Sequence, residues 1–196
     1  MLWWQAFALY RTGDFATGIK LLEEIGRLAE EAGHHPDLNL RYGVLEVRLA
    51  TKSTWSLTEL DLTLARQIFA AARDLGVPAD PTSTRTWEIA LDAADVDKVR
   101  AFWAAVLGYE LVGDSDIAAS DGLYPPVYVQ QMDATRTGRN RIHIDVGVPH
   151  DQAEARVAAA LAAGGTLVRD AHAPTWWTLA DPEGNEVDLA TWVGRD

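Results

Sequence analysis

Two adjacent histidines are the residues in the first half of the chain best suited by type and spacing to acid–base chemistry. His34 and His35 are followed by Pro36, which cannot continue a helix. Imidazoles titrate near neutral pH, so one ring of such a pair can donate a proton while the other accepts one. Glu30 lies one helical turn before His34, and we expect it to orient that ring. The alternative is a solvated helix end, where a protonated histidine favours the negative end of the helix dipole.

The elements that position this pair can be predicted from the spacing of apolar residues and caps. Thr58 and Asp61 have the spacing of a capping box at a helix start. The order β-α-β-β-α predicts an α+β fold with one small sheet and helices on one face. The predicted strands include 2–11 and 44–49, and the predicted helices run from Asp14 to near Gly33 and from Thr58 to about Leu75. The apolar face expected of the first helix is Phe15, Ile19, Leu22, Ile25 and Ala29.

This segment resembles the pterin-4a-carbinolamine dehydratase family (4a-hydroxytetrahydrobiopterin dehydratases). The resemblance is carried by Glu30-x3-His34-His35-Pro36-x5-Tyr42, Leu57-Thr58-Glu59-Leu60-Asp61, Phe7 and Thr12-Gly13-Asp14-Phe15-Ala16, and it extends to about Leu75. It implies a compact fold that often assembles as dimers or tetramers. It also implies a hydro-lyase reaction that converts 4a-hydroxytetrahydropterin to quinonoid dihydropterin without a metal or organic cofactor.

The same resemblance implies roles for individual residues. The implied catalytic residues are His34, His35 and Asp61, and the implied substrate-binding residues are Glu30, Pro36, Lys52 and Trp55. The alternative role of Asp61 is the capping box with Thr58. Lys52 stands where the family usually has a third histidine or a tryptophan. A lysine with its ordinary pKa is protonated at neutral pH, so Lys52 can act as an acid or bind an oxygen, but it cannot be a base.

Composition restricts the classes of function. The 196 residues include 29 acidic residues and 17 lysines and arginines, a net charge of −12 that repels phosphate backbones, so we expect no nucleic-acid partner. Cysteine is absent, which excludes thiolate zinc sites and a cysteine nucleophile and is compatible with a reducing cytoplasm. No apolar run approaches the ~20 residues that span a membrane. We therefore expect a cytoplasmic protein without a membrane partner.

A stretch over 76–84, with two prolines and small polar residues, predicts a boundary between domains. We expect a pterin dehydratase-like domain over 1–77, a linker over 78–85 and a second domain over 86–196. Residues 107–114 resemble residues 163–170, which favours two tandem βαβββ modules around a cleft. The predicted strands of the second domain are 86–92, 109–112, 127–132, 141–148, 166–168, 176–180 and 186–190, with helices over 95–107 and 150–163.

The second domain resembles the vicinal oxygen chelate superfamily, most closely its glyoxalase/bleomycin-resistance-like proteins. The carrying segments are 92–95 (DAAD), 101–109 (AFWAAVLGY), 140–146 (NRIHIDV) and 181–186 (DPEGNE). The superfamily includes isomerases, dioxygenases, lyases and metal-free binding proteins, so the resemblance indicates fold more than activity. Its metal-ligand positions are matched here by Glu88, Gln130, His143 and Asp188. This donor set suits a divalent ion of unknown identity, and the alternative is an empty or organic-ligand pocket.

Three functions follow from these observations. The leading expectation is a 4a-hydroxytetrahydrobiopterin dehydratase-type lyase with His34 and His35 as the acid–base pair. The second is a metal-dependent isomerase, lyase or dioxygenase that acts on a small substrate with adjacent oxygens. The third, favoured by Lys52, is a non-catalytic binding or dimerisation protein. The expected partners are a small pterin substrate and further copies of the chain, since an exposed edge of the first strand tends to pair.

Overall fold

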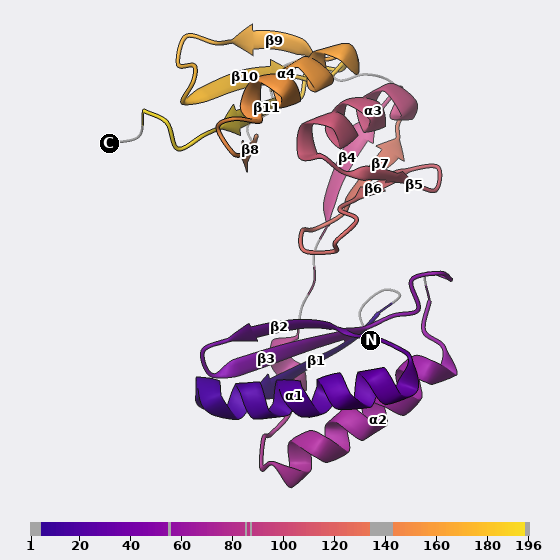
Figure 1. Ribbon diagram of the computed structural model, residues 1–196. Coiled ribbons are helices and arrows are strands. Elements are labelled where there is room, and N and C mark those ends of the chain that lie inside the picture. Colours follow the sequence, from indigo (N-terminus) through magenta and orange to yellow (C-terminus); the bar gives the residue numbers. More distant parts are fainter. Residues whose placement is uncertain (1–4, 55, 85, 87, 134–142, 195–196) are drawn as a thin grey trace. The chain divides into compact units, whose positions relative to one another are not determined.

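The computed structural model describes residues 5–54, 56–84, 86, 88–133 and 143–194. The chain divides into two compact units, Met1–Thr86 and Trp87–Asp196 (Figure 1). Both units combine helices with β-sheets, so the α+β class predicted from the sequence is confirmed. Among the described residues, no helix combines the length and the apolar character that crossing a membrane requires.

The first unit is a three-stranded antiparallel sheet with two helices on one face (Figure 1). The strand order is β1-β3-β2, and the predicted order β-α-β-β-α is confirmed. Leu45, Val47 and Leu49 alternate onto the helix-covered face and are buried, as their spacing predicts. The elements are β1 (Ala6–Arg11), α1 (Phe15–Ala32), β2 (Asp37–Arg41), β3 (Val44–Leu49), α2 (Glu59–Asp74) and the short helix η1 (Pro81–Ser83).

Helix α1 begins and ends at the residues its caps predict. Asp14 Oδ1 accepts a hydrogen bond from the Thr17 amide at 2.7 Å, and Gly33 ends the helix with a left-handed φ of 58°. The buried face agrees with the predicted one at Ile25 and Ala29, whereas the predicted Phe15 and Ile19 are 47% and 40% exposed.

The buried face of α1 shares Ile25 and Ala29 with the predicted face and otherwise lies one residue earlier in the helix. Its buried residues are Gly18, Leu21, Ile25, Leu28 and Ala29. A Cβ on Gly18 would lie 2.5 Å from Leu40 Cδ1, so the missing side chain at this position permits close approach of the helix to β2. Gly18 is therefore a position at which α1 packs closely against β2.

The start of the predicted linker pairs with β1. The Arg11 amide donates to Pro78 O at 2.9 Å, and the Asp80 amide donates to Leu9 O at 2.7 Å. The Asp80 carboxylate also forms an ion pair with Arg11 at 2.7 Å. This segment covers part of the outer edge of β1, which the sequence analysis expected to be exposed.

The second unit consists of two modules with the same topology, which confirms the predicted tandem βαβββ arrangement. The strand orders are β4-β7-β6-β5 and β8-β11-β10-β9, and the first and last strands of each module are parallel. The first module is β4 (Ile89–Ala93), α3 (Val96–Leu107), β5 (Glu110–Val112), β6 (Asp116–Ala118) and β7 (Val127–Gln131). The second is β8 (Ile144–Gly147), α4 (Ala153–Ala162), β9 (Thr166–Arg169), β10 (Trp176–Ala180) and β11 (Glu186–Ala190).

A buried hydrogen bond from Trp103 helps to join the two modules. Trp103 on α3 donates from Nε1 to Asp181 Oδ2 at 3.0 Å, and Asp181 lies in the turn between β10 and β11. The Asp181 carboxylate also accepts the amides of Glu183 at 2.9 Å and Asn185 at 2.8 Å. It is therefore a buried acceptor that closes the turn and anchors it to the opposite module.

We expect Asp181→Ala to lower the free energy of unfolding of the second unit by about 3 kcal/mol, because it removes the acceptor of the buried Trp103 N–H and of the partly buried amides in the turn. Urea unfolding of the intact chain, with hydrogen exchange of the α3 amides, measures this loss. Trp103→Phe removes one of these donors and keeps an aromatic ring, so it should cost less. A change below about 0.5 kcal/mol for Asp181→Ala, the level of ordinary surface substitutions, would contradict this role.

Candidate functional site

His34 contacts a buried carboxylate from a distant part of the chain. Its Nε2 lies 2.7 Å from Asp61 Oδ1, with the His34 side chain 12% exposed and the Asp61 side chain fully buried. The C-cap of α1 directs the ring, because Gly33 adopts the left-handed region and the His34 amide bonds back to Ala29 O at 3.1 Å. Asp61 comes from the first turn of α2. The fold thus joins two of the predicted catalytic residues that are 27 positions apart.

The second oxygen of Asp61 is held by two threonines. Asp61 Oδ2 accepts hydrogen bonds from Thr51 Oγ1 at 2.7 Å, from the Thr58 amide at 2.8 Å and from Thr58 Oγ1 at 3.0 Å. The bond from the Thr58 amide belongs to the predicted capping box, which is present. The two roles considered for Asp61 are therefore compatible, since Oδ2 serves the cap while Oδ1 faces His34.

These contacts determine the ionisation of Asp61. Burial by itself would raise the pKa of Asp61, but the hydrogen bonds from His34, Thr51 and Thr58 outweigh burial and lower this pKa to about 2. Asp61 is therefore a carboxylate at neutral pH and can only accept. It follows that His34 Nε2 carries the hydrogen in this contact, and Nδ1 is the ring nitrogen left for other chemistry.

The lowered pKa of Asp61 predicts an acid-sensitive contribution to stability. Because the folded state holds this pKa at about 2, below the ordinary value near 4, the contribution is complete above pH 4 and is lost as the pH falls toward 2. We expect the difference in unfolding free energy between the wild type and Asp61→Asn to shrink by about 2 kcal/mol between pH 5 and pH 2. Urea titrations across this range measure the difference, and a constant difference would contradict the assignment.

His35 lies in a different environment from His34. Its Nε2 is 3.1 Å from Glu30 Oε1, and the His35 side chain is 62% exposed. The prediction that Glu30 orients His34 is therefore wrong, because the turn at Gly33 directs His34 toward α2 and leaves His35 beside Glu30. The two adjacent imidazoles thus consist of one buried, carboxylate-bound ring and one solvent-facing ring.

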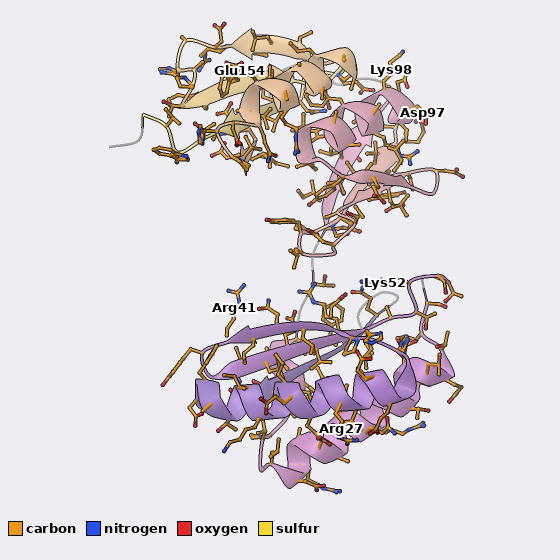
Figure 2. All side chains as sticks on the ribbon, in the orientation of Figure 1. Arg27, Arg41, Lys52, Asp97, Lys98 and Glu154 are labelled. Carbon is orange, nitrogen blue, oxygen red and sulfur yellow. The ribbon has the colours of Figure 1, made fainter. Side chains whose placement is uncertain are left out.

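Lys52 lies in the loop after β3 (Figure 2). Its Nζ is 3.2 Å from Asp37 Oδ1, and both side chains are exposed. Asp37 begins β2 directly after Pro36, so this ion pair links the Lys52 loop to the strand that follows the histidines. Trp55, the other residue predicted in this loop, lies outside the described residues.

The first unit also has an apolar hollow of about 220 Å³. It is lined by residues of β1, β3 and α2, with Tyr10 and Phe69 among them, and by Ala79. His34, His35 and Asp61 are not part of its lining. The hollow and the histidine pair are therefore separate features of this unit.

In the second unit, His143, Asp145 and Asp188 form a cluster of metal-type donors. One ligand atom from each lies within 4.8 Å of the others, and His143 Nε2 is 3.3 Å from Asp145 Oδ1. The parallel register of β8 and β11 pairs Asp145 with Asp188, on the sheet face opposite the buried Val187 and Leu189. Sequence reasoning missed Asp145, although a strand places residues i and i+2 on one face and so predicts Asp145 beside His143.

The other two predicted metal ligands lie in the first module. Glu88 precedes β4, is exposed and is not a member of the cluster around His143. Gln130 on β7 pairs in register with Asp92, on the face opposite the buried Val129. The neighbouring Gln131 instead donates to Ala94 O at 2.9 Å. Gln130 is therefore the glutamine that lies on the outward face, and its role as a ligand stays a prediction.

Fold and residue clusters together define a two-unit protein built from two enzyme-type domains. Residues 7–71 match the family model described as pterin 4 alpha carbinolamine dehydratase, and residues 88–190 match the model described as a glyoxalase-like domain. The chain belongs to the pterin-4-alpha-carbinolamine dehydratase family through its first unit and to the glyoxalase-like domain family through its second.

Two curated relatives illustrate the first match, and both carry provisional names as pterin-4-alpha-carbinolamine dehydratases. The Nocardia farcinica protein is 42% identical over 60 residues, which are 31% of this chain and 63% of that protein. The Thermomicrobium roseum protein is 37% identical over 67 residues, which are 33% of this chain and 72% of that protein. The chain thus spans 63% of the length of the first of these relatives.

Solved structures resemble each unit. A transcriptional coactivator/pterin dehydratase from Brucella melitensis is 32% identical with a TM-score of 0.34, over 35% of this chain and 73% of that one. A glyoxalase/bleomycin resistance protein/dioxygenase family enzyme from Burkholderia phytofirmans is 18% identical with a TM-score of 0.43, over 53% of this chain and 95% of that one. The fosfomycin resistance protein FosX from Listeria monocytogenes is 14% identical with a TM-score of 0.45, over 58% of this chain and 94% of that one.

Proposed function

We propose that the first unit is a hydro-lyase that dehydrates pterin-4a-carbinolamine, that is, 4a-hydroxytetrahydrobiopterin. The observation that carries this proposal is the 2.7 Å contact between His34 Nε2 and the buried, ionised Asp61. Membership of the dehydratase family supports the choice of substrate. A carboxylate that fixes one ring nitrogen of a histidine leaves the other nitrogen poised for proton transfer.

The dehydration requires two proton movements. The departing hydroxyl leaves as water once it gains a proton, and a ring N–H of the substrate loses a proton as the new double bond forms. His34 Nδ1 takes up the proton from the substrate nitrogen, and Asp61 stabilises the imidazolium that results. The ammonium of Lys52, held by Asp37, is suited to binding or protonating the departing oxygen. His35, exposed beside Glu30, is the second group able to carry a proton at the site.

A direct assay tests this function. Carbinolamine generated in situ decays slowly by itself, and its conversion to quinonoid dihydropterin can be followed by stopped-flow absorbance with the intact chain. We expect the decay rate to rise in proportion to protein concentration. A rate equal to the spontaneous one at every protein concentration would contradict the proposal.

We also propose that the second unit binds a divalent metal ion, as the second candidate function. The specific observation is the cluster of His143, Asp145 and Asp188, whose one imidazole and two carboxylates fit Mn²⁺, Fe²⁺, Ni²⁺, Mg²⁺ or Zn²⁺. A bound ion would polarise adjacent oxygens of a small substrate as a Lewis acid. The parallel pairing of β8 and β11 holds the two carboxylates side by side. Isomerase, lyase and dioxygenase chemistry are the candidate reactions for this unit.

The remaining expectations stay predictions. Self-association, a cytoplasmic location and the absence of a nucleic-acid partner all rest on the sequence analysis above. The net charge of −12 continues to favour the last of these.

A further inference from the structure

Thr51 occupies a junction between the loop that carries Lys52 and the buried carboxylate that contacts His34. Its backbone closes the loop, because the Thr51 amide donates to Ser56 O at 3.0 Å and Thr51 O accepts from the Thr54 amide at 3.1 Å. Its side chain leaves the loop and donates to Asp61 Oδ2 at 2.7 Å. One residue thus connects the loop, the start of α2 and, through Asp61, the ring of His34.

The hydroxyls of Thr51 and Thr58 form a short chain that ends on Asp61. The two Oγ1 atoms are 2.8 Å apart, and the contact from Thr51 to Asp61 is shorter than the 3.0 Å contact from Thr58 Oγ1. A hydroxyl has one hydrogen to donate. The Thr51 hydrogen points to Asp61 Oδ2, so Thr51 Oγ1 is an acceptor toward Thr58, and the single hydrogen of the Thr58 hydroxyl is shared between Thr51 Oγ1 and Asp61 Oδ2. A 2.7 Å O–H···O distance from Thr51 is typical of a strong bond to an ionised acceptor.

The Thr51 hydroxyl affects both the orientation and the charge of the Asp61 carboxylate that contacts His34. A buried carboxylate needs donors on both oxygens to stay ionised and to keep one orientation. The Thr51 hydroxyl helps hold Oδ2 against α2, so that Oδ1 faces the imidazole, 2.7 Å from Nε2. Without this donor, Oδ2 keeps only its contacts with Thr58, so the carboxylate is held less firmly and its charged form is less favoured. A protonated Asp61 no longer requires the hydrogen to lie on His34 Nε2.

We propose that Thr51 is a positioning residue for His34, and that its hydroxyl fixes the orientation and charge of Asp61 and thereby the ring tautomer that leaves Nδ1 free. This inference rests on the proposed dehydratase function for its kinetic consequence. Its structural consequence, the state of the His34 ring, does not depend on that function. Removing a residue that orients a functional side chain without itself touching the substrate typically lowers activity by about tenfold to a hundredfold.

The test compares three variants of the intact chain. Thr51→Val keeps the shape of the side chain and removes its hydroxyl, whereas Thr51→Ser keeps a hydroxyl at this position. Thr54→Val is the control, because it removes a neighbouring hydroxyl that bonds Thr51 O and Ser56 Oγ and does not contact Asp61. We expect Thr51→Val to lower kcat for carbinolamine dehydration by about tenfold or more with KM changed less than about twofold. Thr51→Ser should recover most of the rate, and Thr54→Val should match the wild type.

Nitrogen NMR of the His34 ring supplies the readout that is independent of activity. We expect solvent exchange of the His34 Nε2 hydrogen to accelerate about tenfold or more in Thr51→Val, and to return to the wild-type rate in Thr51→Ser. If the wild type is active and Thr51→Val changes neither kcat nor the exchange rate, the positioning role is overturned and the proposed function stands. If the wild type is inactive, the proposed function fails, and the exchange rates alone decide the role of Thr51.

Discussion

Replacing His34 with alanine is expected to slow enzyme-catalysed carbinolamine dehydration by about 10²–10⁴-fold, the usual contribution of a positioned acid–base group. The reason is that Nδ1 of His34 is the nitrogen left free by the contact of Nε2 with the ionised Asp61. The loss should lie mainly in kcat, because the ring acts on protons that move in the transition state. Stopped-flow rates at saturating substrate measure it.

His34→Gln is the matched variant for this prediction. A glutamine side chain can donate an N–H to Asp61 and so keep the buried carboxylate paired, but it cannot exchange protons near neutral pH. We expect His34→Gln to fold with nearly wild-type stability and to be as inactive as His34→Ala. A His34→Gln variant with wild-type kcat would show that His34 is structural and that proton transfer belongs to another group.

The second large effect concerns the metal-donor cluster of the second unit. We expect His143→Ala to weaken Mn²⁺ binding to the intact chain by about a hundredfold or more, because each of the three donors would supply a direct ligand in the proposed site. Asp145→Asn should also weaken binding strongly, since Asp145 faces both His143 and Asp188. Titration of Mn²⁺ followed by electron paramagnetic resonance measures free and bound ion.

Glu88→Gln and Gln130→Ala are the controls that separate two ligand sets. If the ion is held by the cluster alone, both variants should bind Mn²⁺ like the wild type, because Glu88 is outside the cluster and Gln130 belongs to the other module. If the ion is instead held at the four positions that match the metal ligands of the vicinal oxygen chelate superfamily, Glu88→Gln and Gln130→Ala should weaken Mn²⁺ binding and Asp145→Asn should not. A wild type that binds no Mn²⁺ at millimolar concentration would remove the second candidate function.

Local signals account for the parts of the fold that could be predicted from the sequence. Caps and turns act within a few residues, so Asp14, Gly33 and the Thr58–Asp61 box correctly located helix ends. The internal repeat similarly predicted the two modules. Strand β6 was missed because its three residues, with only Ile117 fully buried, are too short to show a period.

Tertiary contacts account for the parts that could not be predicted. Gly18 is buried on α1 beside Leu40, and the helix sequence alone does not show that neighbour. Similarly, Asp61 was expected at the site from the family pattern, but its contact with His34 crosses from α2 to the end of α1. Glu30 was assigned to the wrong imidazole because helical spacing ends at the left-handed Gly33.

In the proposed mechanism, an ionised Asp61 holds His34 so that Nδ1 is the nitrogen that exchanges protons with substrate. The nitrogen-15 NMR spectrum of the His34 ring in the intact chain, recorded where the imidazole is neutral, tests it most directly. We expect a protonated Nε2 with a slowly exchanging hydrogen and a bare Nδ1. A ring with its hydrogen on Nδ1 and a bare Nε2 facing Asp61 would contradict it.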